Sequence, residues 1–115
     1  MNTSNEEWKG KRFSIRYNRY EKFIIGCKSA VAIRVLSVLV LNAELGYHNK
    51  IYITRDAIAK ELGTSVEVVS NACRLLVKKD VISKISNGYM LNPSFVFVGS
   101  ESEINKIFAI WVRTK

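Results

Sequence analysis

The sequence predicts a single α+β domain in which three helices, a β-hairpin and a final helix follow a basic N-terminal segment. Apolar residues recur at helical spacing through residues 29–45 and again through 66–76. After residue 80 the pattern changes to short β runs around an Asn-Gly pair. With 115 residues, 48% of them hydrophobic and 24% charged, the chain has the size and composition of one ordinary globular core.

Positive charge is concentrated in the N-terminal segment, over residues 9–28. The chain has 18 Lys and Arg against 10 Asp and Glu, a formal net charge of +8. Between residues 9 and 28 the only acidic residue is Glu21. We therefore predict a basic arm over residues 1–28, a folded domain over residues 29–115, and a polyanion as the partner. Alternation over residues 13–17 favours a strand, whereas residues 20–24 suit a helix, and the sequence leaves this choice open.

A mostly apolar helix is predicted over residues 29–45. Its helical spacing is carried by Val31, Val35, Val38, Leu39 and Leu41. Gly46 supplies the residue expected just beyond a helix C-terminus. The run is short for a membrane span and is interrupted by Arg34, Asn42 and Glu44, so we predict no membrane segment. A helix that is apolar around nearly its whole turn must be buried, either in its own domain or against a second copy.

Two capped helices are predicted next, after a very short strand over residues 51–54. Thr54 can cap a helix running from Arg55 to Leu62, which Gly63 then ends. Thr64 or Ser65 can cap the following helix, and Thr64 with Glu67 has the form of a capping box. The second helix should therefore begin near Val66.

The two helices have the spacing of a helix-turn-helix. Ala59 is small where the helices approach, Gly63 permits the tight turn, and Val69 fills the angle between them. The predicted buried stripe of the second helix is Val66, Val69, Ala72, Cys73 and Leu76. The opposite side carries Glu67, Ser70, Asn71, Arg74 and Lys78.

The last third of the chain is predicted to form a hairpin, an apolar strand and a helix. Val81 to Ile85 and Tyr89 to Leu91 flank an Asn-Gly turn signal, since both turn residues accept positive φ. Phe95 to Val98 is a further apolar stretch. Ser100 and Glu103 form a capping box before a helix with Ile104, Ile107, Phe108 and Trp111 on one stripe. The whole order predicts a winged helix-turn-helix with an apolar N-terminal helix, a short β-hairpin wing and a C-terminal helix.

This architecture predicts binding to duplex DNA, because a projecting helix fits a major groove about 12 Å wide. The helix residues expected to face the bases or backbone are Ser65, Glu67, Val68, Ser70, Asn71, Arg74 and Lys78. Asn71 suits adenine, Arg74 guanine, and Glu67 a cytosine amino group. Thr54 and Thr64, at helix N-termini, suit phosphates. Further expected contacts come from Lys84, Asn87 and Tyr89 on the wing and from Lys11, Arg12, Arg16 and Arg19 on the arm.

The same sequence argues against cofactors and catalysis. Cys27, Cys73 and a single histidine, His48, assemble neither a zinc site nor a disulfide scaffold, which favours a reducing cytoplasm. Residues 26–29 resemble the end of a phosphate-binding loop but lack the adjacent Gly-Lys pair and the upstream glycine, so we predict no nucleotide cofactor. We find no nucleophile with a plausible base, and we predict no metal and no enzymatic activity.

The stretch from Ile51 to Trp111 resembles the RepL-type plasmid replication proteins and, more distantly, the MarR and Crp groups of winged-helix regulators. The resemblance lies in IYITRDAIAKELGTSVEVVSNACRLLVKKDVISKI and, more distinctively, in NGYMLNPSFVFVGSESEINKIFAIW. It implies a cytoplasmic protein that binds a plasmid origin, with the recognition helix at Ser65, Glu67, Ser70, Asn71 and Arg74 and the wing tip at Asn87, Gly88 and Tyr89. Asp80 stands where many winged helices have Gly, and Asp tolerates left-handed backbone.

The sequence supports three functional hypotheses. The first is an origin-binding replication protein, the second a transcriptional repressor of the same architecture, and the third an adaptor that docks onto another protein. For the DNA-binding hypotheses we expect a homodimer, formed through the 29–45 helix or the C-terminal helix. Its recognition helices would lie about 34 Å apart and match a palindromic site.

Overall fold

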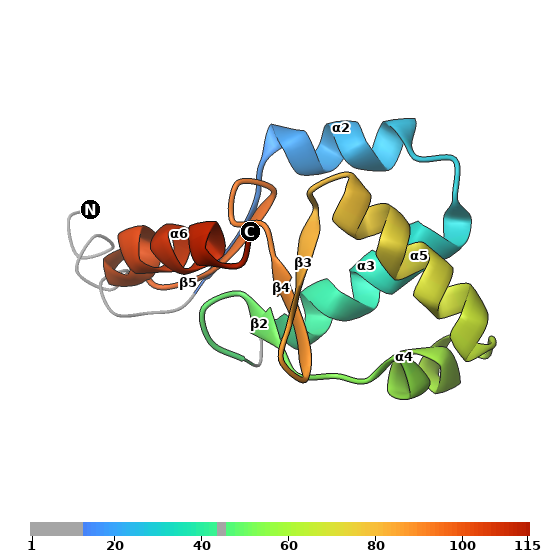
Figure 1. Ribbon diagram of the computed structural model, residues 1–115. Coiled ribbons are helices and arrows are strands. Elements are labelled where there is room, and N and C mark those ends of the chain that lie inside the picture. Colours follow the sequence, from blue (N-terminus) through green and yellow to red (C-terminus); the bar gives the residue numbers. More distant parts are fainter. Residues whose placement is uncertain (1–12, 44–45) are drawn as a thin grey trace.

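The computed structural model describes residues 13–43 and 46–115 and confirms the α+β class (Figure 1). Lys11 and Arg12 lie outside the described residues. The elements are β1 (Phe13–Arg16), α2 (Asn18–Gly26), α3 (Ala30–Ala43), β2 (Lys50–Ile51), α4 (Arg55–Leu62), α5 (Val66–Lys78), β3 (Ile82–Ile85), β4 (Gly88–Leu91), β5 (Val96–Gly99), the 3-10 turn η1 (Glu101–Glu103) and α6 (Ile104–Arg113).

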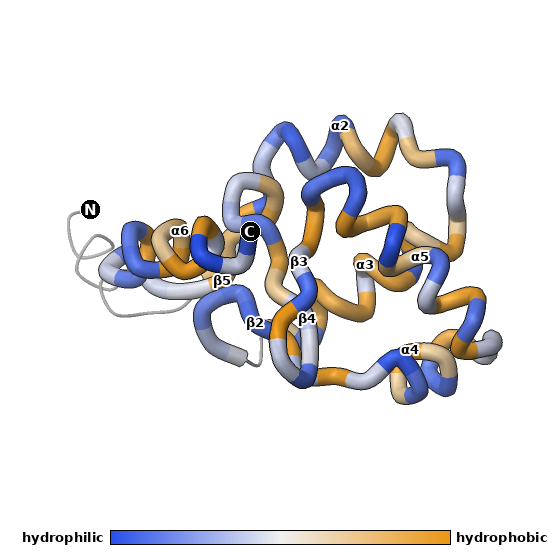
Figure 2. The backbone as a smooth tube through the Cα atoms, in the orientation of Figure 1, coloured by the Kyte–Doolittle hydropathy of each residue, from blue (hydrophilic) through white to orange (hydrophobic). Residues whose placement is uncertain are grey.

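The winged-helix part consists of three helices and a small sheet. The helix α5 packs on α3 and α4, and the strands form an antiparallel sheet in the order β2-β4-β3. Between α5 and β3, Asp80 adopts φ 64°, the left-handed turn predicted for this residue. Val69, Leu76, Val81 and Ile82 are buried in the main core, which α3 crosses. In Figure 2 hydrophobic residues mark stretches of α3, at the centre of this arrangement, and of α5 and the wing strands around it.

Helix α3 is buried within its own chain. Val35, Val38 and Leu39 are buried as predicted, and Ala32, Leu36, Val40 and Ala43 add to the same core. Leu41 is the exception on the predicted stripe, with 58% of its surface exposed. None of the helices among the described residues is long and apolar enough to cross a membrane.

The basic arm contains both a strand and a helix, in succession. Strand β1 pairs antiparallel with β5, so that Ile15 lies opposite Phe97. Helix α2 then packs against the main core through Tyr20, Phe23 and Ile24. The alternation over residues 13–17 and the apolar residues over 20–24 were therefore both correct signals, each for its own stretch of chain.

A second, smaller core lies under the C-terminal helix. Met90, Phe97, Ile107 and Trp111 form it, and Phe13 of β1 packs against it. The predicted capping box is present: Glu103 Oε1 accepts from the Ser100 backbone N–H at 2.8 Å and from its hydroxyl at 2.9 Å. Figure 1 shows α6 lying over β5, beside the helical part of the molecule.

Asn49 joins the two sheets through hydrogen bonds in the protein interior. Its side chain is fully buried and its backbone is left-handed, with φ 62°. Its Nδ2 donates to the carbonyls of Leu91 at 3.1 Å and Val96 at 2.7 Å, and its Oδ1 accepts from Val98 N–H at 2.8 Å. One amide thus fastens β4 to β5.

The wing turn differs from the predicted Asn-Gly turn. Its two central residues are Ser86 and Asn87, because Ile85 already pairs with Gly88, and among the two only Asn87 has positive φ. A glycine is needed at position 88 for another reason, because strand β2 passes too close for a side chain there. A Cβ there would lie 2.0 Å from the Ile51 carbonyl oxygen of the neighbouring strand β2.

Candidate nucleic-acid interface

The turn between α4 and α5 is fixed by two caps and a left-handed glycine. The Thr54 hydroxyl accepts from Ala57 N–H at 3.0 Å, and Gly63 adopts φ 68°. Ser65 caps α5 by accepting from Val68 N–H at 3.3 Å. The predicted capping box of Thr64 with Glu67 is wrong. Thr64 is still part of the turn, where its N–H donates to the Ala59 carbonyl, so Ser65 takes the cap position.

One face of α5 stands clear of the protein. Four members of the predicted buried stripe are buried, but Val66 is 40% exposed, because the helix begins there beyond the reach of the core. The exposed face carries Glu67, Val68, Asn71, Arg74 and Lys78. Their side chains span the length of the helix from its first turn to its last. We call this set the α5 face.

Two predicted contact residues are instead buried. Ser70 has 9% of its surface exposed and Tyr89 has 2%. Both side chains meet Arg55, whose Nε donates to the Tyr89 hydroxyl at 3.0 Å and whose Nη1 donates to the Ser70 hydroxyl at 3.3 Å. The structure therefore buries Ser70 and Tyr89, against the expectation that they are exposed contact residues. They join α4, α5 and β4, because Ser70 lies on the side of α5 that faces the wing.

Burial and hydrogen bonding determine the protonation states of the cluster formed by Arg55, Tyr89 and Cys73. Burial raises the pKa of Tyr89, although its bond to Arg55 acts in the opposite direction. The same bond is the main reason why the pKa of Arg55 is raised. Burial also raises the pKa of the Cys73 thiol, so this cysteine stays protonated as a core residue. At neutral pH the cluster holds one positive charge, on Arg55.

Two clefts separate the α5 face from the wing. A cleft of about 200 Å³ is lined by Arg55, Arg74, Val77 and Lys84, and a cleft of about 340 Å³ is lined by Thr54, Asp56, Val66 and Asn87 among others. The Lys84 ammonium donates to the carbonyls of Ile85 at 2.9 Å and Gly88 at 3.3 Å. Three basic side chains thus line the smaller cleft beside α5, and the exposed Asn87 lines the larger one.

The two residues best suited to reading bases are already in contact. Arg74 Nη1 donates to Asn71 Oδ1 at 2.6 Å, and both side chains are exposed. This bond holds the guanidinium over the α5 face and leaves its remaining N–H groups available as donors. Asn71 and Arg74 therefore form one hydrogen-bonding unit on the α5 face.

The described part of the basic arm, residues 13–28, lies away from the groove between α5 and the wing. Arg19 Nη1 donates to the Ser94 hydroxyl at 2.6 Å, and its guanidinium lies 4.3 Å from the centre of the Phe95 ring. The guanidinium of Arg16 lies 5.8 Å from the Tyr20 ring centre. The structure does not bring these two arginines to the groove between α5 and the wing. Thr54 is exposed beside the wing tip, and Thr64 is half-buried in the turn.

Arg55 is the functional candidate that the sequence reasoning missed. It occupies the first turn of α4, where a positive charge opposes the helix dipole. A cation in that unfavourable position is a signal of a specific contact elsewhere in the fold. Its partners, Ser70 and Tyr89, are 15 and 34 residues away, so local spacing does not reveal them.

Arg55→Ala is expected to weaken binding to a preferred DNA duplex by roughly tenfold, because the groove loses a fixed charge and the wing loses its tie to α5. Arg55→Lys keeps the charge but not the forked hydrogen bonds. Its affinity for the duplex should therefore lie between those of the wild type and Arg55→Ala. Fluorescence anisotropy with labelled duplex measures this, and Lys60→Ala, an exposed residue of the same helix, is the control. Equal affinities for Arg55→Ala and Lys60→Ala would contradict the role given to Arg55.

Comparison with known proteins adds one match. The family model described as Firmicute plasmid replication protein (RepL) matches residues 24–113, from the end of α2 through α6. No curated protein and no solved structure is similar enough to match the chain. Among the described residues, no group of three His, Cys, Asp or Glu side chains is placed to hold a metal ion.

Proposed function

Because the chain belongs to the family of Firmicute plasmid replication proteins (RepL), we propose that it binds duplex DNA sequence-specifically at the replication origin of the element that encodes it. The observation that carries this proposal is the exposed α5 face, bordered by a groove with Arg55, Arg74 and Lys84. A plasmid is replicated in the cytoplasm, where we expect the protein to act. The activity proposed is binding, with no catalytic step.

In the proposed complex, α5 lies in the major groove. Arg74 donates to guanine O6 and N7, Asn71 pairs with adenine, and Glu67 accepts from a cytosine amino group, the pairings that suit these side chains. Lys78, Lys84 and Arg55 contact phosphates on either side of the helix. Asn87 and the wing tip reach the adjacent backbone.

A transcriptional repressor would use the same face, so the family match favours replication while the location of the target site separates the two. A protein-interaction adaptor would need no basic groove beside α5. The net charge of +8 also fits a nucleic-acid partner better than an adaptor. We therefore place the adaptor last.

We further propose a homodimer that contacts a palindromic site. Of the two surfaces considered, α3 buries most of its apolar side chains in its own domain and exposes Leu41, whereas α6 exposes both Phe108 and Val112, the latter 68% exposed. This favours α6 as the contact. Sedimentation equilibrium measures the oligomeric state of the wild type and of Val112→Glu. A dimer that persists in Val112→Glu would exclude α6 as the dimer contact.

The proposal is tested by selecting preferred duplexes from a random pool and measuring their affinity as a function of salt. We expect a consensus site that occurs in repeats within the origin, and a log-log salt slope of about −0.9 for each phosphate neutralised. A single site over a promoter would instead support repression. Failure to enrich any consensus, with weak binding that is independent of salt, would contradict DNA binding altogether.

A further inference from the structure

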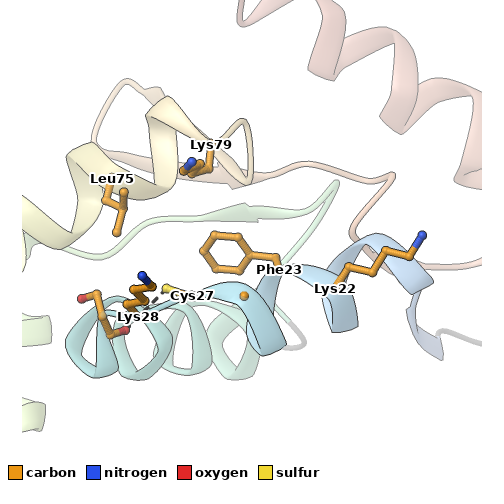
Figure 3. Close-up of a pocket in the computed structure, with 8 residues that line it drawn as sticks. Lys22, Phe23, Cys27, Lys28, Leu75 and Lys79 are labelled. Atoms are coloured by element: carbon orange, nitrogen blue, oxygen red, sulfur yellow. Dashed lines mark hydrogen bonds between the residues drawn. The ribbon is translucent and has the colours of Figure 1, made fainter.

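A cavity of about 560 Å³ lies between α2 and α5, on the side of α5 away from the wing (Figure 3). Its volume is within the range of about 300–1,000 Å³ that small-molecule sites occupy. The proposed function does not use it. Its lining comes from three stretches of chain: helix α2, the corner between α2 and α3, and the C-terminal part of α5.

The floor of the cavity is apolar. Phe23, Cys27 and Leu75 line it, and all three are partly buried against the main core. Figure 3 shows the Phe23 ring extending into the space between α2 and α5, with Leu75 on the α5 side. A flat apolar group placed there would be shielded from water on two sides.

The rim of the cavity is positively charged. Lys22, Lys28 and Lys79 line it, and no acidic residue is among its described lining. Each lysine is exposed, and none has an ion pair or an ammonium hydrogen bond within the described ranges 13–43 and 46–115. In Figure 3 Lys28 and Lys79 stand at opposite edges, whereas Lys22 extends outward along α2.

The N-terminus of α3 adds to this positive potential. Ser29 lines the cavity and its hydroxyl caps α3 by accepting from Ala32 N–H at 3.1 Å. The partial positive charge of a helix N-terminus attracts anions. The cavity therefore combines an apolar floor, two opposed ammonium groups and a helix N-terminus.

We propose that this cavity binds an amphipathic anion, a small molecule with an aromatic body and a single carboxylate, sulfonate or phosphate group. The aromatic body lies on Phe23 and Leu75. The anionic group lies between Lys28 and Lys79. A ligand with both groups matches the apolar floor and the positively charged rim, whereas a bare phosphate would leave the floor without a contact.

Occupancy of the cavity is expected to weaken DNA binding, and this part rests on the proposed function. Leu75 lies in the last turn of α5, and Lys79 follows the exposed Lys78, the last residue of this helix. A bound anion neutralises lysines beside the α5 face and lowers the electrostatic attraction for DNA. By linkage, DNA must weaken anion binding by the same factor.

Anilinonaphthalene sulfonate is a suitable probe, because its fluorescence rises in an apolar site, and phenylnaphthylamine provides the same rings without the charge. We expect saturable binding of one sulfonate probe per chain and at least tenfold weaker binding of the neutral probe. The variant with Lys28→Gln and Lys79→Gln should lose about tenfold in affinity for the sulfonate. Lys106→Gln, an exposed residue of α6, is the matched control and should bind normally.

A second variant fills the cavity without disturbing the core. Gly26 lines the cavity, and a Cβ there would meet no atom within 4 Å, so Gly26→Phe can fold while its ring blocks the site. We expect it to abolish probe binding and keep its thermal transition. Probe affinity unchanged in both variants, or equal affinity for the neutral probe, would overturn the site. Unchanged DNA affinity at saturating sulfonate would overturn the coupling, whereas absence of DNA binding without probe would count against the proposed function alone.

Discussion

Arg74→Ala is expected to weaken binding to the selected duplex by about 5- to 150-fold and to flatten the sequence preference at one position. This is the loss of about 1–3 kcal/mol that a bidentate contact to guanine contributes. Arg74 is exposed on the α5 face, and its hydrogen bond to Asn71 holds it there. Asn71→Ala should therefore both lose its own base contact and loosen Arg74. Fluorescence anisotropy with the preferred duplex and with single-base variants measures both effects.

Lys78→Ala is the matched control for Arg74→Ala. It lies on the same exposed face of α5, one turn further on, where a backbone phosphate is the expected partner. Lys78→Ala should weaken binding to all DNA sequences about equally. It should also reduce the log-log salt slope by the contribution of about one phosphate contact. If Arg74→Ala behaved like Lys78→Ala, with preference intact, Arg74 would be a phosphate contact and the proposed base reading would be wrong.

Asn49→Ala is expected to destabilise the protein by about 3–4 kcal/mol. The change leaves the carbonyls of Leu91 and Val96 and the N–H of Val98 without their side-chain partner in the interior. It also places Ala at a left-handed position, which Asn tolerates better. A domain of this size has about 5–15 kcal/mol of stability in total, so the melting temperature should fall by roughly 12–17 °C. Thermal and urea unfolding followed by circular dichroism measure this loss.

Two comparisons isolate the cause of that loss. Asn49→Gly restores the backbone freedom but not the hydrogen bonds, so it should remain destabilised by about 2–3 kcal/mol. Asn42→Ala removes an asparagine whose side chain, among the described residues, donates to the Val38 carbonyl of its own helix, and it should change stability little. A fully stable Asn49→Gly would show that the amide does not fasten the two sheets.

The helix-turn-helix could be predicted from the sequence because its signals are local. Thr54 and Ser65 cap helices, Gly63 turns the chain, and Asp80 takes the left-handed position before the wing. Each of these depends on residues a few positions apart. The boundaries of α4 and α5 follow from those caps and agree with the expected starts at Arg55 and Val66.

The parts that the sequence did not reveal depend on residues far apart in the chain. By local spacing Ser70 is an exposed helix residue and Tyr89 an exposed wing residue, whereas in the fold both hydroxyls accept hydrogen bonds from the Arg55 guanidinium. Gly88 matters because β2 passes close to it, which no turn rule describes. Pairing of β1 with β5 and the bonds of Asn49 are likewise tertiary.

The most direct test of the central claim is an amide NMR titration of the labelled protein with the selected duplex. The proposal predicts that the largest shifts fall on Glu67–Arg74 of α5, on Arg55 and on Asn87 at the wing tip, with α6 little changed. Shifts confined to α6 or to the β1–β5 sheet, with α5 unaffected, would contradict the account, because DNA would then be bound by another face.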